Sequence, residues 1–146
     1  MLSNTCKYGI RAILFIASKQ IKNEKVGLKL ISDELKIPQP YLAKILQTLS
    51  KKKILDSSKG PHGGFSLLKN PAKLTLMDII LAIDGDYYIE SCFITGGKCS
   101  FEGKDKSQCL LHDDLKKERL RMTKYFSSRT IESMVKQKRR TPTLKI

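Results

Sequence analysis

Three cysteines and a histidine lie close together in the second half of the chain, at Cys92, Cys99, Cys109 and His112. Their spacing is C-x6-C-x9-C-x2-H, and many of the residues between them are glycine, serine, threonine or charged. Such turn-forming, polar residues can wrap a small object but cannot bury a core of their own. Thiolates and imidazole are ligands of zinc and of iron–sulfur clusters, so this segment predicts a metal or iron–sulfur site.

Other interpretations of these cysteines remain open. Structural zinc sites usually use C-x2–4-C knuckles, which gaps of six and nine residues fit poorly. Free thiols acting as redox sensors are a second alternative, although that scheme gives His112 no role. An enzyme with Cys and His as nucleophile and base would need a pocket and an oxyanion hole, and no motif supplies either. Cys6 falls on the apolar side of the first expected helix and is interpreted as a core residue.

The net charge of +14 is unevenly distributed. Residues 1–73 carry 14 Lys/Arg against 4 Asp/Glu, residues 74–114 carry 3 against 8, and residues 115–146 carry 11 against 2. Basic blocks of this kind favour a polyanion partner. Without an apolar run long enough to span a membrane or a signal-peptide pattern, we expect a cytoplasmic protein whose grouped cysteines are ligands, not disulfides.

Two short helices with a tight turn between them are predicted at residues 28–36 and 41–52. Ile37-Pro38-Gln39-Pro40 forces the turn, because a proline pushes the residue before it out of helical geometry. We expect the first helix to bury Leu30, Ile31 and Leu35. The second turns a polar, basic face outward that includes Tyr41, Lys44, Gln47 and Lys51. The pattern indicates a helix-turn-helix, although an ordinary helical hairpin fits the segment equally well.

A basic hairpin follows and favours the helix-turn-helix. Strands are predicted at 54–58 and 64–68, with Lys59-Gly60-Pro61-His62-Gly63 between them. Such a tip is typical of a wing that runs along phosphates or enters a minor groove. For DNA contacts we therefore predict Tyr41, Lys44, Gln47 and Lys51 in the major groove, with Lys59, Gly60 and His62 at the wing tip.

The predicted fold class is mainly α with a small β-hairpin wing, a winged helix-turn-helix plus a long dimerisation helix. Further helices are expected at about 4–19, 74–83, 113–126 and 131–136. The sparse apolar stripe of helix 113–126 is typical of a pairing seam. The expected organisation is a DNA-binding domain at 1–84, a cysteine-rich cluster-binding loop at 85–112, dimerisation and terminal helices at 113–137, and a disordered basic tail at 138–146.

Several segments in this order resemble the Rrf family of winged-helix regulators, which includes IscR, NsrR and CymR. The resemblance covers nearly the whole chain, and its segments are Lys7-Tyr8-Gly9-Ile10-Arg11-Ala12, Gln39-Pro40-Tyr41-Leu42-Ala43-Lys44-Ile45-Leu46, Lys59-Gly60-Pro61-His62-Gly63-Gly64-Phe65-Ser66-Leu67, Leu76-Met77-Asp78-Ile79-Ile80 and Ile83-Asp84-Gly85. It implies a DNA-binding transcription regulator, for example a repressor, that is a homodimer on a palindromic operator.

The resemblance also implies a cofactor. Cluster-bearing members place three cysteines where Cys92, Cys99 and Cys109 lie, and IscR-like members add a histidine where His112 lies and hold a 2Fe–2S cluster. Other members take a carboxylate from the partner's first helix, but the corresponding residue here is the cation Lys7. We therefore expect redox, nitric oxide or iron sensing through a 2Fe–2S cluster, with 4Fe–4S as an open alternative. A cluster-free regulator that senses through free thiols or a partner metabolic enzyme is the other alternative.

Overall fold

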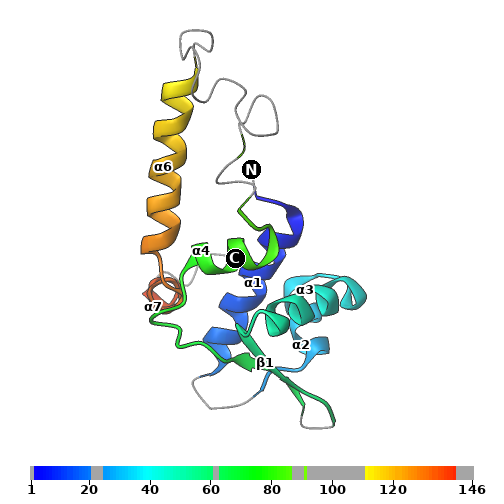
Figure 1. The fold of residues 1–146 in the computed structure, drawn as a ribbon. Helices are drawn as coiled ribbons and strands as arrows, with labels where there is room; N and C mark the ends of the chain where they lie inside the picture. Colours follow the sequence, from blue (N-terminus) through cyan, green and yellow to red (C-terminus); the bar gives the residue numbers. More distant parts are fainter. Residues whose placement is uncertain (1, 21–24, 61–62, 87–90, 92–110, 141–146) are drawn as a thin grey trace.

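The part of the chain described by the computed structural model, residues 2–20, 25–60, 63–86, 91 and 111–140, is mainly helical with one antiparallel hairpin (Figure 1). This confirms the predicted fold class. The elements in chain order are α1 (Asn4–Lys19), α2 (Leu28–Leu35), α3 (Gln39–Lys51), β1 (Leu55–Ser58), β2 (Gly64–Leu67), α4 (Leu76–Ile83), α6 (His112–Ser128) and α7 (Ile131–Arg140).

Helix α1 lies at the centre of the core. Its N-cap is Ser3, whose hydroxyl accepts a hydrogen bond from the Cys6 amide at 3.0 Å. Ala12, Ile13 and Ile16 are completely buried, and α1 packs against α3, α4 and α7. At Gly9 the approach is so close that an added Cβ would collide with the Ile83 side chain of α4. The helix predicted at 4–19 is therefore confirmed, and so is the core position of Cys6.

The helix-turn-helix lies against one side of α1. Helix α2 buries Ile31 and Leu35, but the prediction that it also buries Leu30 is wrong, because Leu30 is 47% exposed. Ile31 and Leu35 are four residues apart and share a face. Leu30, one residue before Ile31, is rotated from that face by about 100° and therefore points outward. Helix α3 begins at Gln39, two residues before the predicted start, and includes Pro40 in its first turn.

The hairpin follows α3 directly and projects beyond α2 and α3 (Figure 1). Its register pairs Leu55 with Leu67 and Ser58 with Gly64. Leu55 and Leu67, at the end near the core, are buried, whereas Asp56, Ser57 and Ser58 are exposed. The base of the hairpin is thus held by the core while its tip stands in solvent.

Helix α4 starts with a capping box. The Asp78 amide donates to the Thr75 hydroxyl, and the Asp78 carboxylate accepts from the Thr75 amide at 2.9 Å. The capping box thus satisfies two of the backbone donors at the start of the helix. Ile79 and Ile80 are buried, and the helix ends at Asp84, followed by Gly85 with a φ of +72°.

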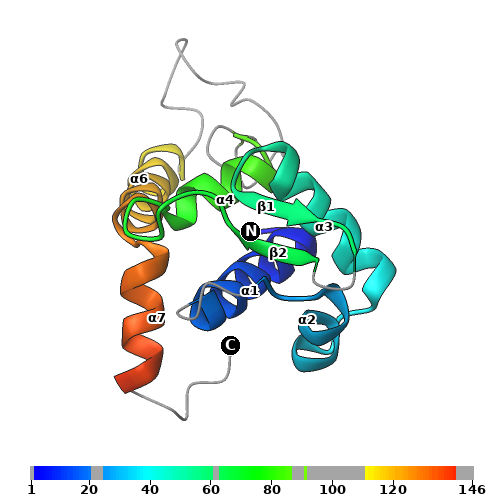
Figure 2. The same ribbon diagram turned by 90° about the horizontal axis from the view of Figure 1, so that it is seen from below.

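Helix α6 projects from the body, and none of its residues is buried (Figure 1). After α6 the chain returns to the segment before α4. There the Ile131 amide donates to the Leu74 carbonyl at 2.8 Å, and the Leu76 amide donates to the Arg129 carbonyl at 2.9 Å. Helix α7 then packs on α1, on the side away from α2 and α3 (Figure 2). It extends to Arg140, beyond the expected end at residue 136. No helix in the described part of the chain is long and apolar enough to span a membrane.

Candidate nucleic-acid interface

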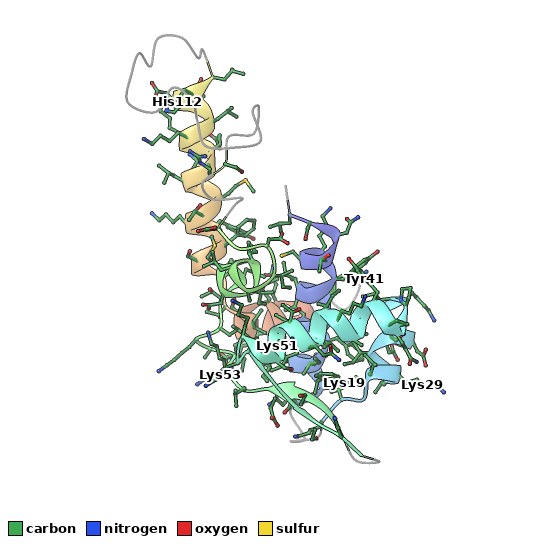
Figure 3. All side chains as sticks on the ribbon, turned by 45° about the vertical axis from the view of Figure 1, so that its right-hand side comes forward. Lys19, Lys29, Tyr41, Lys51, Lys53 and His112 are labelled. Carbon is green, nitrogen blue, oxygen red and sulfur yellow. The ribbon has the colours of Figure 1, made fainter. Side chains whose placement is uncertain are left out.

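Helix α3 separates its apolar and polar residues onto opposite sides. Leu42, Ile45, Leu46 and Leu49 are buried. The predicted major-groove residues all lie exposed on the other side, where Tyr41 is 37% exposed; these residues are Tyr41, Lys44, Gln47 and Lys51, which we call the reading face. Figure 3 shows Tyr41 and Lys51 near the two ends of the helix. The structure thus brings the four predicted residues together on one accessible surface.

The turn between α2 and α3 fixes the angle of the reading face. Lys36 has a left-handed conformation, with a φ of +55°, and ends α2. The buried Ser32 hydroxyl donates to the Ile37 carbonyl at 2.6 Å, and Ile37 is itself buried. The Pro38 carbonyl accepts from the amides of Tyr41 and Leu42 at 3.1 and 3.0 Å. These bonds, with the Ile37 side chain in the core, hold the turn between α2 and α3.

Helix α1 holds the helix-turn-helix from behind. The Tyr8 ring meets the Tyr41 ring edge-on at 5.9 Å, and the Arg11 guanidinium lies over the Tyr8 ring. Arg11 also donates to the Leu35 carbonyl at the end of α2, at 3.0 Å. Tyr8 and Arg11 belong to the segment 7–12 that carries the family resemblance. Their contacts give that segment a structural role in holding α2 and α3.

The glycines of the wing are required by its geometry. Gly60 has a φ of +106°, a conformation that glycine adopts readily, and it is exposed together with Lys59. A Cβ at Gly63 would collide with the Ser58 carbonyl oxygen, and one at Gly64 would lie 2.6 Å from the Val26 carbonyl oxygen. Val26 lies that close because it pairs with Phe65 through two backbone bonds of 2.9 Å. His62 lies outside the described residues.

We expect Gly64→Ala to lower the free energy of unfolding by about 3 kcal/mol, because the new methyl group meets backbone that cannot move and the φ of +154° is strained for alanine. Denaturant unfolding measures the change. Gly27→Ala is the matched control, since a Cβ there meets nothing within 4 Å, and it should cost about 0.5–1 kcal/mol as a helix N-cap. Equal losses for the two variants would contradict the close-approach explanation.

An ion pair neutralises the one acidic side chain of the wing strands. Lys25 Nζ lies 2.7 Å from Asp56 Oδ2 and 3.0 Å from the Ser58 hydroxyl. This hydrogen bond, with the charge of Lys25, lowers the pKa of Asp56. Asp56 therefore stays ionised but paired, which limits its repulsion of a phosphate beside the wing.

The predicted metal ligands are only partly described by the structure. Cys92, Cys99 and Cys109 lie outside the described residues. His112 is the first residue of α6 and is half-buried, at the end of that helix remote from α3 (Figure 3). Among the described residues no three His, Cys, Asp or Glu side chains form a group that could hold a metal. The metal site therefore stays a prediction.

Cys6 is the one cysteine among the described residues. Its side chain is completely buried, and this burial, together with the neighbouring carboxylate of Asp84, raises the pKa of the thiol to about 12. The thiolate is the reactive form of cysteine, so Cys6 stays a neutral, unreactive thiol near pH 7. Cys6 is thus unsuited to sensing through its own oxidation.

A helix-turn-helix with an exposed basic face, followed by a glycine-tipped wing, defines a winged helix-turn-helix DNA-binding protein. The model of the Rrf2 family, described as iron-dependent transcriptional regulators, matches residues 2–137. The chain therefore belongs to the Rrf2 family of DNA-binding transcriptional regulators, which are not enzymes.

Individual relatives agree with this. A protein of Aquifex aeolicus (strain VF5), provisionally named an HTH-type transcriptional regulator, is 35% identical, covering 92% of this chain and 91% of the relative. The HTH-type transcriptional regulator IscR of Photorhabdus laumondii is 28% identical, covering 92% and 78%. The structure of CymR, the global cysteine regulator of B. subtilis, aligns with a TM-score of 0.78 at 20% identity, covering 94% and 97%, and shows the same fold.

Proposed function

We propose that this protein is a homodimeric regulator that binds a palindromic operator, and that an iron–sulfur cluster sets its affinity for that operator. The observation that carries the proposal is the exposed reading face of α3 beside a basic wing, in a chain of a family described as iron-dependent. In this proposal DNA is read by α3 and the wing, and the cysteine segment supplies the signal.

The chemistry of the reading face suits the major groove. The amide of Gln47 can pair with the edge of adenine, and the ammonium groups of Lys44 and Lys51 can reach guanine or phosphate. Lys59 and Gly60 fit a phosphate contact at the wing, since one supplies a cation and the other lets the backbone come close. His62 stays a proposed wing contact.

Helix α6 supports the proposed homodimer. Met122 and Tyr125 are 47% and 53% exposed and lie one turn apart on one side of the helix, and Leu111, at its N-cap, is 51% exposed on the same side. A charged helix that leaves such a stripe in solvent is typical of one that pairs with a second copy. A twofold axis through this seam would place two reading faces on two operator half-sites.

The donor set fits an iron–sulfur cluster. Cys92, Cys99 and Cys109 would supply three thiolates, and His112 would supply a neutral imidazole, a combination that iron–sulfur centres accept. When bound, such a cluster supplies a group that changes charge on reduction and is lost to oxidation or nitric oxide. His112 begins α6, and Asp84 ends α4, so the segment between them joins the proposed dimer helix to the DNA-binding domain. Cluster binding there would shift α6 relative to the DNA-binding domain.

The experiment starts with anaerobic purification. We expect a red-brown protein, with iron and acid-labile sulfide in a ratio near that of a 2Fe–2S cluster. An operator would be selected from a random-sequence duplex library, and its affinity compared at fixed salt before and after the cluster is removed. We expect a difference of about tenfold, within the usual range of coupling between two sites.

Variants make this test specific. Cys99→Ala should lose the colour and behave like cluster-free protein, whereas Cys6→Ala is the matched control and should keep both colour and response, because Cys6 is buried away in the core. If the anaerobic protein is colourless and contains zinc, the cysteine segment holds a structural metal ion and no iron–sulfur cluster. An operator affinity that is the same with and without the cluster would overturn cluster control.

A further inference from the structure

Tyr41, at the start of the reading face, is held by α1 as well as by its own helix. Its hydroxyl lies 2.7 Å from the Thr5 hydroxyl, and its ring meets the edge of the Tyr8 ring. Figure 3 shows Tyr41 in the space between α1 and α3. Two contacts, one polar and one aromatic, thus fix both ends of the Tyr41 side chain although its surface remains 37% exposed.

The first turn of α1 is in turn held by α4. The Asp84 carboxylate accepts from the Ser3 amide at 3.0 Å and from the Ser3 hydroxyl at 2.5 Å. The same hydroxyl caps α1 by accepting from the Cys6 amide. Helix α1 has no acidic residue in its first turn, so Asp84 supplies the negative charge that the positive end of the helix dipole favours.

These two sets of contacts are only two residues apart in α1. Ser3 meets Asp84, and Thr5 meets Tyr41, within the first turn of the helix. Asp84 is also the C-cap of α4, and the chain continues from it through Gly85 toward Cys92. A chain of direct contacts through Ser3 and Thr5 therefore connects Asp84 with Tyr41.

We propose that the first turn of α1 transmits the state of the cysteine segment to the DNA-reading face, with Thr5 as the residue that positions Tyr41 and Ser3–Asp84 as the input contact. This inference rests on the proposed function, because it assumes that Tyr41 contacts the operator and that the cysteine segment carries a signal. Thr5 acts through Tyr41 and touches no DNA itself.

The first test removes one hydroxyl at a time. Thr5→Val keeps the shape of the side chain and should weaken binding to the selected operator about fivefold per half-site, the worth of one neutral hydrogen bond in each subunit. Binding to unrelated duplex DNA and its salt dependence should stay unchanged, because no cation is lost. Thr5→Ser, which keeps the hydroxyl, should restore operator binding. Tyr41→Phe should weaken operator binding as much as Thr5→Val does, and the double variant should bind the operator no more weakly than either single variant.

The second test addresses the input contact. Asp84→Asn removes the charge opposite α1, and Ser3→Ala removes the hydroxyl bond without changing charge. Both variants should reduce the ratio of operator affinities measured with and without the cluster by at least about half. The reason is that the free energy of one hydrogen bond is comparable to the whole coupling free energy between two sites. Circular dichroism checks that each variant is folded. If Asp84→Asn does not fold, Ser3→Ala alone tests the input contact.

Several outcomes would overturn the inference. The first is that Thr5→Val binds the operator as tightly as the wild-type protein. The second is that Tyr41→Phe loses much more operator affinity than Thr5→Val. The third is that folded Ser3→Ala keeps the wild-type ratio of affinities with and without the cluster. A wild-type protein that does not distinguish the selected operator from unrelated DNA would instead refute the proposed function itself.

Discussion

Replacing Met122 by aspartate is expected to leave the protein monomeric and to weaken operator binding by about 100-fold or more. The loss is large because two linked reading faces gain an effective concentration that a single face lacks, a gain of about 10²–10⁴ in affinity. Sedimentation measures the oligomeric state, and fluorescence anisotropy with the selected operator measures the affinity.

The reason lies in the environment that pairing would create. Met122 is 47% exposed in the single chain, beside Tyr125 on the same stripe, and both would be covered by a second copy of α6. A carboxylate placed there would lose its water without gaining a partner, at a cost of several kcal/mol. The fold should survive, since α6 contributes no buried residue to the core.

Lys124→Asp is the matched control for Met122→Asp. Lys124 lies two residues further along α6, about 200° around the helix, and is exposed to solvent. The same carboxylate on that side should leave the dimer intact. A wild-type protein that sediments as a monomer, or a Met122→Asp variant that still dimerises, would contradict pairing through α6.

The double variant Lys44→Ala/Lys51→Ala is expected to weaken operator binding by at least about 30-fold. Each lysine of the reading face is assigned a contact worth about 1–3 kcal/mol at a base edge, or the release of one counterion at a phosphate. If both contact phosphate in each subunit of the proposed dimer, four contacts are lost and the slope of log affinity against log salt should fall by about 3.6. Anisotropy titrations across a series of salt concentrations measure both quantities.

An equal loss of charge elsewhere controls for net charge. Lys116→Ala/Lys124→Ala removes two exposed cations from α6, a helix outside the helix-turn-helix and the wing, and should change operator affinity by less than about twofold. If the two double variants lose the same affinity, the protein is attracted to DNA by overall charge alone, and the reading face is not the contact surface.

The local patterns of the sequence were enough to predict the helix-turn-helix and the wing. Prolines 38 and 40 mark the turn, apolar spacing gives the buried face of α3, and the glycines of 60–64 predict the hairpin. Leu30 was assigned wrongly because in a helix of eight residues a stripe of three leucines and isoleucines does not determine which edge faces the core.

Contacts between distant residues could not be predicted in the same way. Thr5 and Tyr41 are 36 residues apart, and Ser3 and Asp84 are 81 residues apart. No periodicity in the sequence predicts either contact. The packing of α7 on α1 was missed for the same reason, since only a short final helix was expected at residues 131–136. The bond from Arg11 to the Leu35 carbonyl was not predicted either, although an arginine inside an apolar stripe indicates that a buried acceptor lies nearby.

The attachment of α6 has a mechanical consequence. Its C-terminal end is joined to residues 74–76 by the backbone bonds of Arg129 and Ile131, and the other end, which bears His112, points away from α1 and α3. The helix has 17 residues and is about 25 Å long. A tilt of roughly five degrees about its C-terminal end would move the His112 end by about 2 Å. Small rotations near residues 74–76 are therefore amplified along α6 before they reach His112.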